Sequence, residues 1–280
     1  MVLRTAALAL VLATAASPAP KLAVERMALH QFEDGPVLAA SYEFLPGETA
    51  YFSCRLTGFE TEKNEDDRRV KLSWQFEMLD SSGIPIEKSQ SGKIETRLLP
   101  EDKNWLPKFL ASFTIPPFAA SGDYRVAVKA KDELSGSELS AGLVFHVRGH
   151  EVEASPTLVA RNFRFLSSEE DTIGTRSAVY HPGDMLWARF DITGYKFGPN
   201  NHFSVNYGLA VESAEGKQLF AEPEAAGESK ETFYPQRYIA GILSLSLDKN
   251  VPPATYTLVV TIRDQDGNQT WEERQTFRVE

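Results

Sequence analysis

Oxygen-bearing side chains alternate around a glycine near the C-terminal end of the sequence, where they could bind a cation. Asp264, Asp266 and Asn268 surround Gly267 in the run DQDGN. Carboxylate and amide oxygens suit Ca²⁺, but the ion takes about six to eight of them, and the bidentate glutamate of a complete calcium loop is missing here. Asp-Gly is also a favoured hairpin turn. The pattern predicts either a calcium site at these residues or, as the preferred interpretation, a plain turn between two strands.

Acidic residues gather in two loops of the N-terminal half. Residues 60–69 read ETEKNEDDRR and residues 131–138 read KDELSGSE. In an antiparallel sandwich, the loops that follow the second and the sixth strand meet at one end of the fold. The two loops could therefore form a cation site or an acidic docking tip. The preferred interpretation is a solvated end whose charges prevent sticking.

Aromatic residues at strand and loop positions could form a binding surface. Tyr51 and Trp187 occupy equivalent outward positions on two predicted strands, and Trp105, Tyr234 and Tyr238 lie in predicted loops or at their ends. Aromatic rings on a surface stack on sugars or anchor a protein partner. The alternative, which we prefer, is that these rings are buried between two short-linked domains or beneath neighbouring loops.

Motifs of common catalytic sites are missing from the sequence. It has no glycine-rich phosphate loop, no G-x-S-x-G, no H-E-x-x-H and no pair of cysteines. His146 and His150 are four residues apart, but they fall at a strand end and in a linker, so we expect them to be solvated. The one cysteine, Cys54, alternates with Phe52 and Leu56, which favours a buried, inert thiol. We therefore expect no enzyme and no cofactor, although a site assembled from distant loops would leave no motif.

An internal repeat organises the elements that must position these residues. Residues 46–48 align with 182–184 at an offset of 182 − 46 = 136, and the alternating row at 70–78 aligns with 203–211 at 203 − 70 = 133. The offset changes only between the apolar runs. Because insertions accumulate in surface loops, this is the pattern of two copies of one fold.

Apolar residues alternate with period two in about seven short segments of each half, and no helical period is present. The predicted strands are 23–32, 49–56, 70–79, 84–89, 109–115, 124–130 and 143–147, then 157–166, 185–192, 203–212, 217–221, 239–247, 256–262 and 270–279. This pattern predicts an all-β fold of two tandem antiparallel sandwiches. The predicted domains are 21–148 and 157–280, with a linker at 149–156.

Three positions carry a resemblance to immunoglobulin-like and fibronectin-III-like domains. Trp74 lies on the third predicted strand, Cys54 on the second, and Tyr124 opens the sixth, where Val126 replaces the second cysteine of antibody domains. The second half holds Tyr207, Phe190, Tyr256 and Leu258 where the first holds Trp74, Cys54, Tyr124 and Val126. The chain thus resembles the tandem, disulfide-free immunoglobulin-like repeats of exported bacterial proteins. The resemblance implies a binding or spacer role, with Tyr124 and Tyr256 as structural tyrosine corners.

The first 16 residues resemble a secretory signal peptide. Arg4 precedes a short apolar run and then small residues, and the run is too short to anchor the chain across a bilayer. The whole chain has 29 Lys and Arg against 39 Asp and Glu, a net charge of −10. This balance argues against nucleic acid or an anionic membrane as the partner.

These patterns together predict a non-enzymatic, exported interaction or scaffold protein, located in the periplasm or outside the cell. Its partner would be a protein or a cell-surface component, with no nucleic acid and no membrane insertion. The alternatives are a carbohydrate- or calcium-binding module, or an accessory domain of an extracellular enzyme system.

Overall fold

The computed structural model describes residues 21–64 and 66–280, and the regular secondary structure of these residues is almost entirely β-strand. The one helical element among them is a short 3₁₀ turn, Pro199–Asn201. The prediction of an all-β fold is confirmed. The predicted signal peptide, residues 1–16, lies outside the described residues. Across the two described ranges, no helix is long and apolar enough to cross a membrane.

The N-terminal half contains two sheets. Its strands are β1 (Ala23–His30), β2 (Glu43–Phe44), β3 (Thr49–Thr57), β4 (Glu62–Lys63), β5 (Arg68–Leu79), β6 (Gln90–Leu98), β7 (Lys108–Thr114), β8 (Gly122–Asp132) and β9 (Glu138–Val147). One sheet has the order β1-β3-β7, and the other has the order β2-β9-β8-β5-β4, with β6 also paired to β5. The pairings are antiparallel except for the short pairing of β2 with β9.

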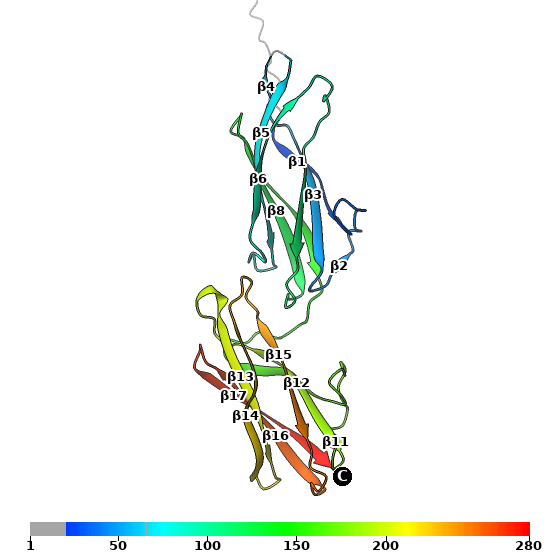
Figure 1. Cartoon of the computed structure of the whole chain (residues 1–280), viewed down its shortest axis with the longest axis vertical. Helices are drawn as coiled ribbons and strands as arrows, with labels where there is room; N and C mark the ends of the chain where they lie inside the picture. The colour runs from blue at the N-terminus through cyan, green and yellow to red at the C-terminus, as the bar shows by residue number, and fades with distance from the viewer. Residues whose placement is uncertain (1–20, 65) are drawn as a thin grey trace, which may run out of the picture.

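The C-terminal half repeats this arrangement. Its strands are β10 (Val159–Leu166), β11 (Val179–Tyr180), β12 (Met185–Thr193), β13 (Phe203–Glu212), β14 (Gln218–Lys230), β15 (Tyr238–Ser246), β16 (Ala254–Asp264) and β17 (Gln269–Val279). The order β10-β12-β15 corresponds to β1-β3-β7, and β11-β17-β16-β13-β14 corresponds to β2-β9-β8-β5-β6. Figure 1 shows the two pairs of sheets placed end to end along the long axis of the molecule.

Each pair of sheets encloses its own cluster of buried apolar side chains, as expected for sheets that are apolar on one face. In the first cluster, Phe52 of β3 contacts Phe76 of β5 edge to face, with 5.5 Å between ring centroids. In the second, Phe190 of β12 and Tyr207 of β13 make a similar edge-to-face contact at 5.5 Å, although they occupy different repeat positions. Cys54 lies in the first cluster at 1% exposure, and burial raises the pKa of its thiol to about 12. The predicted burial of this thiol is confirmed.

Both predicted tyrosine corners form. The hydroxyl of Tyr124 donates a hydrogen bond to the carbonyl of Ala120 at 3.1 Å, and that of Tyr256 donates to Pro252 at 2.8 Å. Each bond spans four residues and fixes the loop that leads into β8 or β16. The two loops are therefore held in the same way in both halves.

The edge strands differ from the sequence prediction. The predicted strand at 84–89 is wrong, because β6 begins only at residue 90, and the predicted strand at 217–221 is only the first part of β14. The chain before β6 forms a turn instead, in which the Asp80 carboxylate accepts hydrogen bonds from the N–H groups of Ser82 and Ile84, each at 2.8 Å. Edge strands are only partly buried, so their apolar alternation is weak and the sequence does not delimit them.

Candidate functional site

The carboxylate of Asp264 is buried and already surrounded by hydrogen-bond donors. The residue is 2% exposed. Its Oδ2 accepts from the N–H of Lys196 and from the side-chain amide of Gln269, each at 2.9 Å, and its Oδ1 accepts from the N–H of Gly267 at 3.0 Å. Asp264 thus ties the loop after β12 to the turn after β16. A cation at this position would compete with these three donors for the carboxylate lone pairs.

The other two residues of the predicted calcium site have different surroundings. Asp266 contacts the Nδ1 atom of His202 at 2.9 Å, and Asn268 supplies the left-handed backbone conformation of the turn, with φ of 50°. Within residues 21–64 and 66–280, no group of three or more His, Cys, Asp or Glu side chains is placed to hold a metal ion. The hydrogen bonds of Asp264 to Gly267 and Gln269 hold the turn that contains Asp266 and Gly267.

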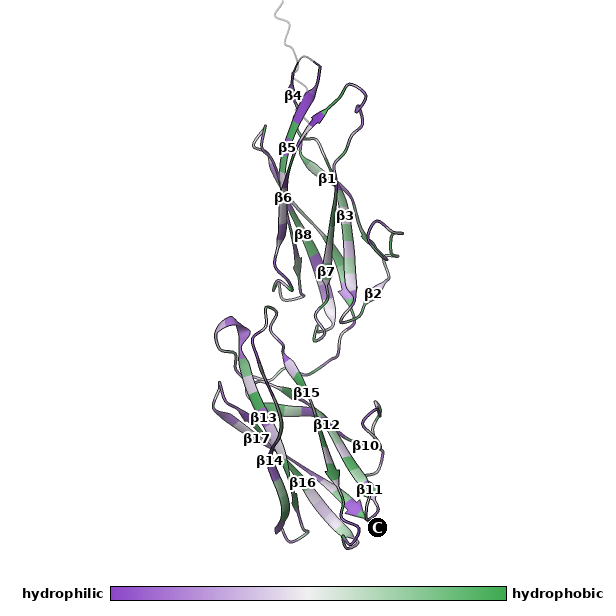
Figure 2. Ribbon diagram, viewed as in Figure 1, coloured by the Kyte–Doolittle hydropathy of each residue, from purple (hydrophilic) through white to green (hydrophobic). Residues whose placement is uncertain are grey.

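Asp132 has the same role in the N-terminal half, at the repeat offset of 264 − 132 = 132. It is 1% exposed, and its carboxylate accepts hydrogen bonds from the N–H groups of Glu60 and Leu134 and from the Ser135 hydroxyl, at 2.7, 3.0 and 2.7 Å. Asp132 therefore holds the two acidic loops together and is not part of an exposed acidic tip. Exposed acidic side chains at this end include Glu62 of β4, which is strongly hydrophilic (Figure 2), and Glu133 and Glu138 of the second loop.

The aromatic residues predicted as a binding surface are dispersed over the molecule. Trp105 packs against the first core, and Tyr51 and Trp187 are half-buried on β3 and β12. Tyr234 and Tyr238 are only 8% and 9% exposed, because they lie where the two halves meet. The five side chains therefore form no common shelf.

A buried carboxylate joins the two halves of the chain. The side chain of Asp80, which follows β5, is 2% exposed. While its Oδ1 accepts from Ser82 and Ile84, its Oδ2 accepts hydrogen bonds from the Tyr234 hydroxyl and from the Arg237 guanidinium, each at 3.0 Å. The Asp80 carboxylate thus accepts hydrogen bonds from two donors of each half. These four hydrogen bonds offset the free-energy cost of burying its charge.

The loop that carries Tyr234 is itself fixed within the C-terminal half. The Asn201 amide donates hydrogen bonds to the carbonyls of Thr232 and Phe233 at 3.2 and 2.8 Å, and the Tyr195 hydroxyl donates to the carbonyl of Gln236. Tyr234 belongs to the buried cluster of the N-terminal half. A well-anchored loop of one half therefore inserts a ring into the core of the other.

Further contacts extend this junction along the linker. The ring of Tyr238 contacts Phe118 edge to face at 5.6 Å and lies 5.1 Å from the ring of His150. The Nε2 atom of His150 is 2.8 Å from the Asp191 carboxylate. His150 is solvent-exposed as predicted, with 43% of its side chain accessible, and it also packs and hydrogen-bonds at the junction.

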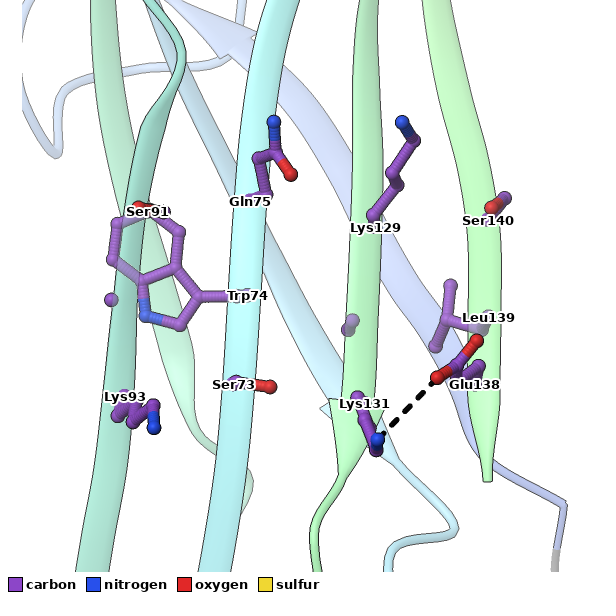
Figure 3. Close-up of a pocket in the computed structure, with 12 residues that line it drawn as sticks. Ser73, Trp74, Gln75, Ser91, Lys93, Lys129, Lys131, Glu138, Leu139 and Ser140 are labelled. Carbon is purple, nitrogen blue, oxygen red and sulfur yellow. Dashed lines mark ion pairs between the residues drawn. The ribbon is translucent and has the colours of Figure 1, made fainter. Parts of the chain in front are cut away.

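The outer face of the first half's larger sheet is hollowed over β9, β8, β5 and β6, with a volume of about 430 Å³ (Figure 3). Short polar side chains form its floor, and three lysines stand among them. We name this surface the lysine face; its outward side chains are Ser73, Gln75, Ser91, Lys93, Lys129, Lys131, Glu138 and Ser140. The pairing register places Ser73 opposite both Lys93 and Lys131.

The charges of the lysine face leave room for an anionic ligand. Lys131 lies 3.6 Å from Glu138 and Lys129 lies 3.9 Å from Glu77, and such exposed pairs are weak. Lys93 has no ion-pair partner in the described part of the chain. The hollow is lined by three lysines, three serines and Glu138, and the Ser73 hydroxyl donates a hydrogen bond of 2.7 Å to the Glu133 carboxylate. Sequence reasoning missed it because these residues come from four strands whose pairing is not visible in the sequence.

Comparisons with known proteins identify no family for this chain. No family model matches it, and no curated protein matches it. Among solved structures, it is similar to the C-terminal domain of the antigen I/II polypeptide BspA of Streptococcus agalactiae, with 10% identity, a TM-score of 0.29, and coverage of 90% of this chain and 98% of that one. The C-terminal domain of the Streptococcus pyogenes antigen I/II-family protein AspA matches with 7% identity, a TM-score of 0.29, and coverage of 93% and 99%. Similarity at this level carries no argument about function.

Proposed function

We propose that this protein is a non-enzymatic interaction or scaffold protein, exported to the periplasm or the cell exterior. Its proposed parts are a signal peptide (1–16), two immunoglobulin-like domains (21–148 and 157–280) and a linker (149–156). The observation that carries this proposal is the junction at Asp80, which holds one half against the other. A chain fixed in this way presents its surfaces at a constant spacing, as a scaffold requires.

The lysine face is the proposed contact surface for a protein or cell-surface component. It is broad, polar and built on the rigid strands of a sheet, so its side chains keep their positions without a partner. Exposed lysines on such a face steer an acidic partner and set the rate of its association more than its final affinity.

Site-specific cross-linking tests this role. A photo-reactive amino acid placed at Gln75, in the middle of the lysine face, should form a reproducible covalent adduct in cells that export the protein. The double variant Lys93→Glu and Lys129→Glu should abolish the adduct, because the contact depends on positive charge. The same label at Ile173, which is 87% exposed on a loop of the other half, is the control. Equal adducts at both positions, or no adduct at Gln75, would contradict the proposal.

A second candidate function is the binding of an acidic glycan, which the lysines and hydroxyl groups of the same face favour. A polysaccharide that carries carboxylate or sulfate groups should bind the purified protein, and binding should weaken as salt rises. A neutral polysaccharide is the matched control. Binding that is insensitive both to salt and to Lys93→Glu would remove this candidate.

The export part of the proposal has its own test. Removal of residues 1–16 should leave a mature protein that begins near Ser17, because the small residues before that point form a cleavage signal. Mass spectrometry of the protein isolated from its source would decide this, and a mature chain that begins at Met1 or Val2 would contradict it.

A further inference from the structure

In each half, the edge strands of the two sheets run beside each other and leave a seam. In the N-terminal half, side chains cap the seam between β6 and β7. The Gln90 amide donates a hydrogen bond to the carbonyl of Ser112 at 2.7 Å, and the Glu87 carboxylate accepts one from the N–H of Thr114 at 2.8 Å. The edge of β7 is thereby occupied, and no further strand can be added there without displacing these groups.

The C-terminal half has different residues at the corresponding positions. Gln90 pairs with Phe76 across β5 and β6, and Glu222 pairs with Leu209, the repeat partner of Phe76, across β13 and β14. Glu222 therefore stands where Gln90 stands in the first half. By the same register, Ser244 and Ser246 of β15 correspond to Ser112 and Thr114 of β7. An ionised glutamate only accepts hydrogen bonds, so Glu222 cannot cap the Ser244 carbonyl as Gln90 caps Ser112.

The backbone edge of β15 remains open at this seam. The N–H of Ile242 points away from β12, since it donates a hydrogen bond of 3.5 Å to the Tyr207 hydroxyl. Backbone groups of alternate residues point to the same side of a strand, which places those of Ser244 and Ser246 on the open edge. Among the described residues, no side chain or loop donates to or accepts from them.

An apolar groove of about 420 Å³ lies beside this open edge, between β14 and β15. Leu245 and Val211 form part of its wall, and Leu219 and Phe220 of β14 stand at its side with 53% and 45% exposure. The carboxylates of Glu222 and Asp248 also line it, and neither has an ion-pair partner within the part of the chain that the structure describes. The groove thus combines unpaired backbone groups, apolar wall and negative charge.

We propose that the groove between β14 and β15 binds an extended segment of a partner protein, which adds to β15 as a further β-strand. Its backbone would pair with Ser244 and Ser246, its apolar side chains would fill the groove beside Phe220, and a lysine or arginine would pair with Glu222 and Asp248. We infer an extended strand as the occupant because the unpaired backbone groups of Ser244 and Ser246 can form the hydrogen bonds of a β-sheet edge. We infer that this strand is basic because the carboxylates of Glu222 and Asp248 line the groove. The inference rests on the proposed interaction role and names the chemistry of one partner.

A synthetic peptide tests the proposal on the full chain. The probe is a fluorescent peptide of about eight residues that alternates valine with threonine and lysine, as an added strand requires. It should bind with a rise in fluorescence anisotropy. A second peptide with proline at its centre, and a third with glutamate in place of lysine, should each bind at least about tenfold more weakly, because they lack the ladder N–H or the complementary charge.

Two variants locate the binding in the groove. Glu222→Gln restores the capping residue of the first half and should weaken binding at least about tenfold, although it is a conservative change at an exposed residue. Phe220→Lys should weaken it by removing apolar wall. Ile173→Lys, a matched change of an exposed apolar residue outside the groove, should leave it unchanged. Equal affinity for the proline peptide, or unchanged affinity in both groove variants, would overturn the proposal.

A second copy of the chain is the competing occupant. Sedimentation at increasing protein concentration should show a monomer, and a dimer that Phe220→Lys dissolves would overturn the partner-strand proposal in favour of edge pairing between copies. The cross-linking experiment at Gln75 tests the N-terminal half, whereas the groove lies in the C-terminal half. The lysine-face proposal and the groove proposal can therefore be contradicted independently of each other.

Discussion

The Tyr234 hydroxyl donates a hydrogen bond of 3.0 Å to the carboxylate of Asp80, across 154 residues of sequence. Asp80 directly follows strand β5 of the first half, and Tyr234 belongs to a loop of the second. The bond is buried, and Arg237 supplies a second donor to the same oxygen. This arrangement makes the relative placement of the two halves a property of the fold and not of the linker alone.

Asp80→Ala should lower the free energy of unfolding by about 2–4 kcal/mol, because it leaves the Tyr234 hydroxyl and the Ser82 and Ile84 N–H groups without their acceptor. Denaturant melts check this. Asp123→Ala is the control, since its side chain is 75% exposed beside His146, and its effect should stay within about 0.5 kcal/mol.

Asp80→Ala should also make the placement of the two halves relative to each other more variable. Spin labels at Ser91→Cys and Lys217→Cys would report the distance between them, and the buried Cys54 should stay unlabelled because its thiol has a pKa of about 12. Asp80→Ala should broaden the distance distribution. A distribution unchanged from that of the parent protein would mean that the junction does not set the orientation.

Stability should fall steeply at alkaline pH. Burial raises the pKa of Tyr234 above its ordinary value of 10.0, and the neighbouring Tyr124 and Asp80 raise it further. Above pH 10 the unfolded chain releases the phenol proton while the folded chain keeps it, so stability present below pH 10 is lost as pH rises, at about 1.4 kcal/mol per pH unit for this group. Unfolding free energies measured from pH 8 to 11 should show a shallower decline in Tyr234→Phe. An identical slope in the two proteins would contradict this.

Gly92→Ala should destabilise the N-terminal half by about 1–3 kcal/mol, as overpacking does. A Cβ atom at Gly92 would come within 2.7 Å of the Trp74 indole, which stacks on Phe76 in the core. Gly198→Ala is the matched control, because its nearest neighbour would be 3.8 Å away. Thermal melts compare the two, and an equal shift would mean that the indole moves aside without cost.

Millimolar Ca²⁺ should leave the melting temperature unchanged. Ligand that binds only the folded state must stabilise it, by about 2.7 kcal/mol at a hundredfold excess over its dissociation constant. Asp264 already accepts from three donors, so Asp264→Ala should lower stability equally with and without the ion. A melting shift with Ca²⁺ that Asp264→Ala abolishes would establish the calcium site instead.

The sequence by itself determined the features that depend on local periodicity. Alternation along β5 and β13 and the positions of Tyr124 and Tyr256 sufficed to predict an all-β chain, a repeated strand pattern, a buried Cys54 and two tyrosine corners. These follow from the sequence because side chains of a strand alternate between two faces whatever the partner strand is.

Only the tertiary structure decided which distant residues meet. It brought Asp80 to Tyr234, assembled the lysine face from four strands, and gave Asp132 and Asp264 the same buried role. It also showed that Gln90 caps the backbone edge of β7 in the first half, whereas Glu222 leaves the backbone edge of β15 in the second half open. Strand order, register and the packing of one half on the other come from non-local contacts, and no periodicity within a single strand encodes them.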